Sequence, residues 1–395
     1  MSTCKNCLYK KSHPFGLFIK DAICSGCITH KEKYEIDWIN RNELLKNRIT
    51  KITKKNKSYY DCVIPYSGDA EDYHVVNIVL GLGLNPLMVS INDYFLNDIG
   101  WHNSHNLITY FDLDSYNFNP EISAYKELVR TSMRKYTHAL WPSLALKSAF
   151  PVHVAKQKKI PLIIHGQNQS IEQVGKFSHL EEVESSSWSR VEHDLFGHEI
   201  DDLLGSGGHV VSKDNPYYSY PELSKLGAGK LVGLYLSNYF LWDPLYQNSK
   251  VLEYGFIPQK QSATFDPYER AGSSIYYNFH DLSKKLRCGY RKINDHVARE
   301  IRHSRLNAQE GKKIISHYDS NPVYIKDFFK WLEVSDSGYE WFISHKLHSV
   351  KHLISDKKIE ALKSVNVLPD KLIKNISGGK TPKKSFETFL KGIRL

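Results

Sequence analysis

Short apolar runs alternate with helical patterns in the middle of the chain. The runs short enough to be buried strands are Cys62–Ile64, Pro86–Ile91 and Ile160–Ile164. Between them, apolar residues recur at helical spacing in Val75–Leu82, Asn97–Tyr110 and Glu121–Lys135. Strands that alternate with helices predict an α/β fold with a parallel sheet.

From about Tyr218 onward the pattern changes to amphipathic helical runs with few strand signals. These runs are Asn294–Arg305, Val323–Leu332 and Asp356–Val365. We therefore divide the chain into an N-terminal cysteine-rich segment, 1–35, a basic linker helix, 36–57, an α/β domain, 58–215, and a helical C-terminal region, 216–395.

Four of the six cysteines form two Cys-x2-Cys pairs, Cys4 with Cys7 and Cys24 with Cys27, with 16 residues between the pairs. This spacing is typical of a zinc ribbon, in which four thiolates hold one tetrahedral ion. Two disulfides are the alternative, which a reducing compartment disfavours. Because no coordination position stays open, we expect the zinc to be structural. Of the remaining cysteines, Cys62 lies in an apolar run, where a buried, inert thiol is favoured over a nucleophile.

Composition limits the class of protein. The 395 residues, 41% hydrophobic, suffice for two or three globular domains. The chain has no run of about 20 apolar residues and no charged start followed by an apolar segment, so we expect a cytoplasmic protein. The net charge of +10 suits acidic or phosphorylated partners. The lysines are spread along the chain, so charge alone does not indicate nucleic-acid binding.

The segment Ile64–Tyr73 has the position of a phosphate-binding loop. An apolar strand runs into Ser67-Gly68, and a helical pattern follows. A helix that starts just after a strand offers unpaired N–H groups and a positive dipole to an anion. However, Asp69, Glu71 and Asp72 would each repel a phosphate. The loop therefore has an anion-binding position and an acidic sequence.

Ligands of parallel sheets bind at the carboxyl ends of the strands, so the residues after each strand are candidates for the same site. After the second strand come Asn92 and Asp93, and after the third come Gly166 and Asn168.

Motifs along nearly the whole chain carry a family resemblance. They are the paired cysteines, Ile36-Asp37-Trp38 with Arg41, Leu84-Asn85-Pro86-Leu87, Gly100 with Asn103 and Asn106-Leu107, Trp141-Pro142, Gly166-x-Asn168 with Glu172 and Gly175, Glu253-Tyr254-Gly255-Phe256, and Gly289-Tyr290-Arg291 with Asp295 and Arg302. In this order and spacing, the chain resembles the N-acetyl sugar amidotransferases, PP-loop proteins that make acetamidino sugars for surface polysaccharides and flagellar glycans.

The resemblance implies a PP-loop nucleotide-binding domain of the adenine nucleotide alpha hydrolase type and an ATP-dependent reaction. ATP with magnesium would activate a sugar acetamido oxygen as an adenylate, and ammonia would displace AMP to leave an amidine. The substrate would be a nucleotide-activated N-acetyl sugar. A separate glutaminase would supply ammonia through a subunit resembling the cyclase half of imidazole-glycerol-phosphate synthase.

The resemblance also implies roles for site residues. Ser67, Gly68, Asn92, Asp93, Gly166 and Asn168 would bind the nucleotide, and Glu71, Asp72 and Glu172 would be catalytic, with Glu71 reaching a magnesium ion.

The loop departs from the family pattern Ser-Gly-Gly-x-Asp-Ser. Only Ser67 and Gly68 match, while Asp69 replaces a glycine, Glu71 an aspartate and Asp72 the last serine. Gln167 also stands where the family has a glutamate. Three hypotheses follow: an active sugar amidotransferase with an altered loop, a catalytically degenerate paralogue that serves as a subunit, regulator or sugar-binding module, and a tRNA-thiolating enzyme. Thiolation is the weakest, because Cys62 and Cys288 form no reactive Cys-x2-Cys pair.

Overall fold

The computed structural model describes residues 3–12, 16–181, 183–204, 216–221, 231–273, 276–358, 366 and 368–377. Its centre is a five-stranded sheet made of β3 (Cys62–Pro65), β4 (Pro86–Ile91), β5 (Ser115–Phe118), β6 (Leu162–His165) and β7 (Val232–Tyr235). All neighbouring strands are parallel, in the spatial order β5-β4-β3-β6-β7. The α/β class and the parallel sheet are confirmed.

This strand order places a crevice at the middle of the sheet. The chain moves outward from β3 to β4 and β5, then returns to the other side of β3 with β6 and β7. The connections on the two sides of β3 leave in opposite directions, so the crevice opens at the carboxyl ends of β3 and β6. Val63 of β3 is paired with Ile163 of β6 at this point.

The predicted strands β3, β4 and β6 are present, whereas β5 and β7 were not predicted. β5 has the sequence Ser-Tyr-Asn-Phe and lies at an edge, with three of its residues exposed. β7 lies beyond residue 215, the predicted end of the α/β domain, so the sheet takes its fifth strand from the region expected to be helical.

Alternate residues of β3, β4 and β6 enter two different hydrophobic cores, one on each face of the sheet. Cys62 and Ile64 of β3 belong to the core that also holds Met88 and Leu162. Val63, which lies between them, belongs to the core on the other face. Both faces are buried, which is why the strands read as continuous apolar runs.

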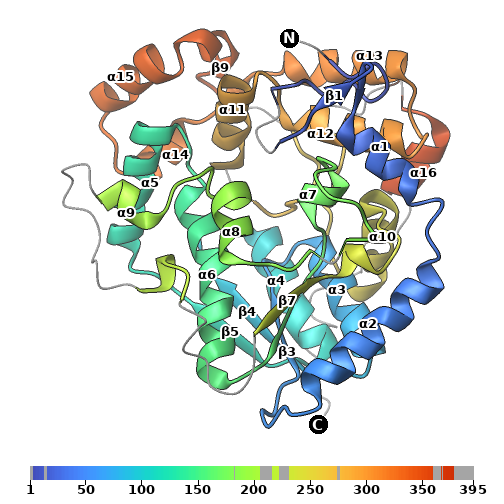
Figure 1. Cartoon of the computed structure of the whole chain (residues 1–395). Helices are drawn as coiled ribbons and strands as arrows, with labels where there is room; N and C mark the ends of the chain where they lie inside the picture. Colours follow the sequence, from blue (N-terminus) through green and yellow to red (C-terminus); the bar gives the residue numbers. More distant parts are fainter. Residues whose placement is uncertain are drawn as a thin grey trace.

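Helices cover both faces (Figure 1). In the α/β part they are α3 (Ala70–Gly81), α4 (Asp98–Phe111), α5 (Ile122–Tyr136), α6 (Trp141–Lys158), α7 (Gln169–Glu172), α8 (Ser187–Ser189), the turn η1 (Arg190–Asp194) and α9 (Ile200–Leu204). Helix α6 packs on β3, β4 and β6, while α3 contributes Val76 and Val79 to the opposite core.

The remaining chain is largely helical, as predicted. It contains the turns η2 (Pro216–Tyr218), η3 (Leu236–Asn238), η4 (Val251–Tyr254) and η5 (His348–Leu353), helices α10 (Pro244–Lys250), α11 (Tyr276–Cys288), α12 (Lys292–Arg302), α13 (Ala308–Asp319), α14 (Lys326–Trp331), α15 (Asp336–Lys346) and α16 (Asp370–Ser377), and the short strands β8 (Val323–Tyr324) and β9 (Ile354–Ser355). The predicted run Val323–Leu332 is thus β8 followed by α14. Most of the run Asp356–Val365 lies outside the described residues.

The N-terminal segment forms a small hairpin and two helices. Strands β1 (Ile19–Lys20) and β2 (Ile23–Cys24) pair antiparallel, and α1 (Ser25–Glu32) and the predicted linker helix α2 (Trp38–Thr53) follow. The hairpin and α1 lie beside α12 and α13, which are far away in the sequence (Figure 1).

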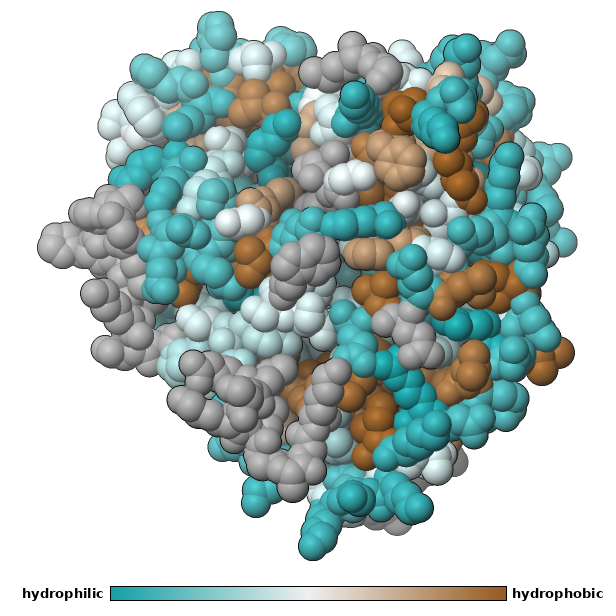
Figure 2. Space-filling view, in the orientation of Figure 1, coloured by the Kyte–Doolittle hydropathy of each residue, from teal (hydrophilic) through white to brown (hydrophobic). Residues whose placement is uncertain are grey.

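One face of the molecule is mostly hydrophilic, with hydrophobic residues gathered over β1 and α1 (Figure 2). Exposed apolar side chains of this segment include Phe18 and Ile28. Within the described ranges, no helix has the length and apolar character needed to cross a bilayer.

Candidate functional site

A cavity of about 440 Å³ lies at the crevice between β3 and β6. Its size is in the range of small-molecule sites. The α/β part supplies one wall, which includes Glu71, Asp72 and Gly166, and the C-terminal region supplies the facing wall, which includes Arg270 and Arg287. The cavity therefore lies where the strand order places a ligand site.

The loop after β3 has the backbone of an anion site, but its donors are already in use. The N–H groups of Ser67, Gly68 and Asp69 all donate to one carboxylate oxygen of Asp72, at 2.8, 2.9 and 3.0 Å. Gly68 has φ +85°, and a Cβ there would lie 2.8 Å from the backbone of Ser104. The group bound at the anion position of this loop is therefore the loop's own Asp72 carboxylate.

Glu71 makes the same kind of contact with the next loop. Its Oε1 accepts a hydrogen bond from the Gln167 N–H at 2.8 Å, and a Cβ at Gly166 would lie 2.2 Å from that oxygen. The loops after β3 and β6 are therefore joined through Glu71. A phosphate that used the Gln167 donor would have to displace this carboxylate.

The acids of this loop are hard to ionise together. Burial raises the pKa of Glu71 to about 8. Burial and the neighbouring Asp69 together raise the pKa of Asp72 to about 7. Burial also raises the pKa of Asp69. The three backbone N–H donors lower the pKa of Asp72 and oppose this effect.

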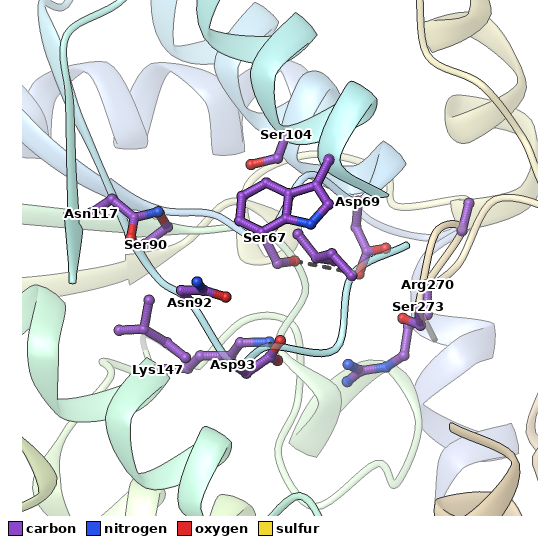
Figure 3. Close-up of a pocket in the computed structure, with 14 residues that line it drawn as sticks. Ser67, Asp69, Ser90, Asn92, Asp93, Ser104, Asn117, Lys147, Arg270 and Ser273 are labelled. Atoms are coloured by element: carbon purple, nitrogen blue, oxygen red, sulfur yellow. Dashed lines mark hydrogen bonds and ion pairs between the residues drawn. The ribbon is translucent and has the colours of Figure 1, made fainter. Parts of the chain in front are cut away.

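Two pockets lie at the end of β4, and both are smaller than a typical small-molecule site. The larger, of about 130 Å³, lies between Ser67, Asp72 and Lys147. The smaller, of about 30 Å³, lies between Ser67, Asn92 and Asp93, which is room for about one water (Figure 3). Asp93 is buried and paired with Lys147 at 2.9 Å, and the Asn92 side chain accepts from the Tyr94 N–H. Both predicted nucleotide ligands are engaged by the protein itself.

The predicted residues after β6 divide between two places. Gly166 and Asn168 line the cavity, and the buried Asn168 Nδ2 has no hydrogen-bond partner within the described residues. Glu172 is buried away from the cavity lining, where it forms an ion pair with Lys33 and accepts from His179 at 3.0 Å. The Glu172 carboxylate thereby links α7 to the N-terminal segment.

The four cysteines Cys4, Cys7, Cys24 and Cys27 come together as the spacing predicts. All are buried and none is in a disulfide, and their sulfurs lie within 4.8 Å of one another. The Cys24 N–H and the Asn6 side chain donate to sulfurs at 3.3 Å. Four sulfurs with N–H donors around them fit a metal held by thiolates. Cys62 is buried, and burial raises its pKa, in agreement with an inert thiol.

The cysteine cluster is tied to both walls of the cavity. Arg302 of α12 donates to the Cys24 sulfur at 3.4 Å and to the carbonyl oxygen of Gln173, after α7, at 2.8 Å. Tyr9 accepts from Gln173 at 2.7 Å and donates to Asp295 at 2.8 Å. A metal at this cluster would therefore hold the α7 loop and α12 in place.

A second group of metal-ligand types is part of a charge network. One ligand atom each of Asp266, Glu269 and His296 lies within 4.8 Å of the others. However, Arg299 pairs with Asp266 and Lys292 pairs with Glu269, so their charges are already balanced by cations. We assign this group to structure rather than to metal binding.

Sequence reasoning missed the basic residues of the cavity. The basic side chains that line it are His280, Lys284 and Arg287 of α11 and His138 from the turn between α5 and α6. Tyr277 of α11 lies on the same face of the helix and also lines the cavity. Their spacing of three or four residues, which puts side chains on one face of a helix, was the available signal.

A family model described as the C-terminal domain of the LPS biosynthesis protein WbpG-like family matches residues 262–365, about a quarter of the chain. No curated protein matches the chain. Similar solved structures include NMN synthetase from Francisella tularensis and NH3-dependent NAD synthetase from Campylobacter jejuni in complex with nitrate, each at 14% identity and a TM-score of 0.28, covering 36% of this chain. The matches span 60% and 62% of those structures. A TM-score this low assigns neither protein's fold nor its activity to this chain. The matched C-terminal segment contains the α11 wall of the cavity.

Proposed function

We propose that the chain acts in the biosynthesis of lipopolysaccharide or a related surface glycan, as an amidotransferase-like protein that binds a nucleotide-activated N-acetyl sugar in the cavity. The observation that carries this proposal is the composition of the cavity. One wall is the carboxyl edge of a parallel sheet, and the other belongs to the segment similar to an LPS biosynthesis domain. The reaction implied by the family resemblance would transfer AMP from ATP to the acetamido oxygen with release of pyrophosphate, and ammonia would then displace AMP, which takes the oxygen with it, to leave the amidine. The ammonia would come from a glutaminase through a cyclase-like subunit.

The loop as it stands does not fit the phosphates of ATP. Asp72 occupies all three backbone donors, Glu71 occupies that of Gln167, and the space beside Asn92 holds about one water. Adenylation at this loop would require both carboxylates to move. We therefore assign no chemical step to ATP at this site.

These contacts favour a second candidate, a degenerate paralogue that binds the sugar substrate and acts as a subunit or regulator. In such a protein the cavity and the cysteine cluster would keep their roles, while Asp72 would replace phosphate in stabilising the loop. A thiolating enzyme has less support, because burial raises the pKa of both Cys62 and Cys288 and so disfavours reactive thiolates.

An amidination assay separates the two candidates. The zinc-loaded protein is incubated with UDP-N-acetylglucosamine, ATP, magnesium and a high concentration of ammonium, and the products are analysed by mass spectrometry. An amidino sugar with AMP and pyrophosphate, lost in Ser67→Ala, supports the amidotransferase. Sugar-nucleotide binding without AMP in any sample supports the subunit, and neither binding nor turnover with this or another N-acetyl sugar nucleotide contradicts both.

A further inference from the structure

We propose that Arg287, His280 and His138 form an anion subsite that holds the diphosphate of the nucleotide-linked sugar. The inference rests on the proposed function for the identity of the ligand. It places the charged part of the substrate against the C-terminal wall, away from the acidic loop after β3.

Three segments bring these side chains to the same part of the cavity. His280 and Arg287 lie seven residues apart on α11, which puts them on one face of the helix. The Phe196 ring lies between the other groups: the Arg287 guanidinium is 5.0 Å from its centroid and the His138 ring 4.9 Å. The His138 and His280 rings are 5.6 Å apart.

The described residues give these basic groups no acidic partner. Arg287 makes no hydrogen bond or ion pair within the described ranges, and its Nε is buried. His138 is 1% exposed, and neither of its ring nitrogens has a hydrogen-bond partner among those residues; the same holds for Nδ1 of His280. Burial lowers the pKa of all three groups.

Neighbouring cations of the same wall differ, because carboxylates balance them. Lys284 pairs with Asp295, and Lys292 pairs with Glu269. Buried polar groups are nearly always hydrogen-bonded, and an unbalanced buried cation is costly. Unpartnered donors that line an open cavity are available to a ligand, which would supply the missing acceptor.

A phosphate group fits this donor set best. Arginine presents planar, paired N–H donors that match phosphate oxygens, and each imidazole adds a donor of its own. Tyr277 and Tyr290 line the same wall, where Arg270 and Lys284 lie over their rings. The phosphates of ATP have the same chemistry, so the experiment must separate the two sources.

The test is calorimetric titration of the full-length, zinc-loaded protein with UDP-N-acetylglucosamine, UDP, free N-acetylglucosamine and a nonhydrolysable ATP analogue. Arg287→Met is the main variant. Lys285→Met is the matched control, since Lys285 lies on the same helix, pairs with Asp319 and does not line the cavity. His280→Gln is a second variant that keeps a donor but changes its position.

We expect Arg287→Met to weaken binding of UDP and UDP-N-acetylglucosamine by about tenfold to a hundredfold, and the control to bind normally. Without ligand, Arg287→Met should unfold at the same temperature as the wild type or higher, because it removes an unbalanced buried cation. His280→Gln should weaken the same ligands less.

Three results would overturn the inference: equal affinities in Arg287→Met and the wild type, a fall in unfolding temperature that accompanies the lost binding, or a dependence on Arg287 only for the ATP analogue. Arg287-dependent binding of UDP-N-acetylglucosamine, without amidination of this or any other N-acetyl sugar nucleotide, would uphold the subsite and refute the reaction proposed above. Amidination that proceeds normally in Arg287→Met would uphold the reaction and refute the subsite.

Discussion

Replacing the two acids that fill the loop after β3 should convert it into a phosphate-binding loop. In Asp69→Gly/Asp72→Ser, the carboxylate that accepts from Ser67, Gly68 and Asp69 is gone, and those N–H groups are free to bind an external anion. Asp69→Gly also removes a second charge beside Ser67. The wild type should bind a nonhydrolysable ATP analogue with magnesium only weakly, because these donors are occupied.

The expected gain follows from the charges removed. At an effective dielectric constant of 20, a carboxylate about 4 Å from a phosphate oxygen repels it by about 4 kcal/mol. Protonation weakens this repulsion, because burial raises the pKa of Asp72 to about 7. About half of the repulsion, or roughly 2 kcal/mol, corresponds to an affinity gain of about thirtyfold. Loss of a helix-start carboxylate costs about 1 kcal/mol of stability, which relief of its burial partly offsets.

Calorimetric titration of the double variant and of Asp98→Ser measures this gain. Asp98 is an exposed acid in the first turn of α4, so its replacement removes one charge at a helix start outside the cavity. A folded double variant that gains no affinity would refute the view that Asp72 occupies a phosphate position. An equal gain in Asp98→Ser would attribute the effect to net charge.

The remaining predictions concern stability. Burial raises the pKa of Glu71 to about 8, so its contribution to stability is full below its ordinary pKa and is lost as the pH rises through 8. This group alone should cost the wild type about 3 kcal/mol between pH 5 and 8 in urea unfolding. Glu71→Gln should lose that much less, although Asp72, with its pKa raised to about 7, still titrates in the same range. An unchanged pH dependence in Glu71→Gln would contradict the assignment. Chelation or Cys24→Ser should lower the unfolding temperature and loosen α12; unaltered stability and no zinc by elemental analysis would refute a structural zinc. Lys33→Met leaves the buried Glu172 without its cation and should cost about 3 kcal/mol in urea unfolding, part of which Lys33→Met/Glu172→Gln should recover. A loss below about 1 kcal/mol would show that the pair contributes little.

The sequence was sufficient to predict the elements whose signal is local. Cys-x2-Cys spacing predicts the sulfur cluster because each pair needs only a tight turn to direct two thiols at one ion. Strands β3, β4 and β6 were found because both of their faces are buried and they read as apolar runs. β5 is a polar edge strand and lacks that pattern. β7 is buried and apolar, but Gly233 interrupts the run and an aromatic stretch follows it, so the strand is not distinct in the sequence.

Partners in space could not be read from the chain. Glu172 belongs to a motif expected at the active site, yet Lys33, 139 positions earlier, removes it from the cavity by forming a buried ion pair. Likewise, the acidity of Asp72 suggested repulsion of phosphate, and the structure adds that its carboxylate occupies the backbone donors of the loop. Both outcomes depend on side-chain direction, which residue spacing does not determine.

The cavity separates its charges in a way that argues for one ligand orientation. On the sheet side, the backbone N–H groups that could hold an anion already donate to Asp72 and Glu71. These donors are therefore not available to an external anion. On the α11 side, Arg287 has no balancing acid among the described residues. An anionic ligand gains most by placing its charge against α11, which directs its uncharged end toward the loops after β3 and β6. In a nucleotide-linked sugar the diphosphate lies between the sugar and the nucleoside, and the proposed amidination requires that the sugar end, with its acetamido group, be the one that approaches Glu71 and Asn168.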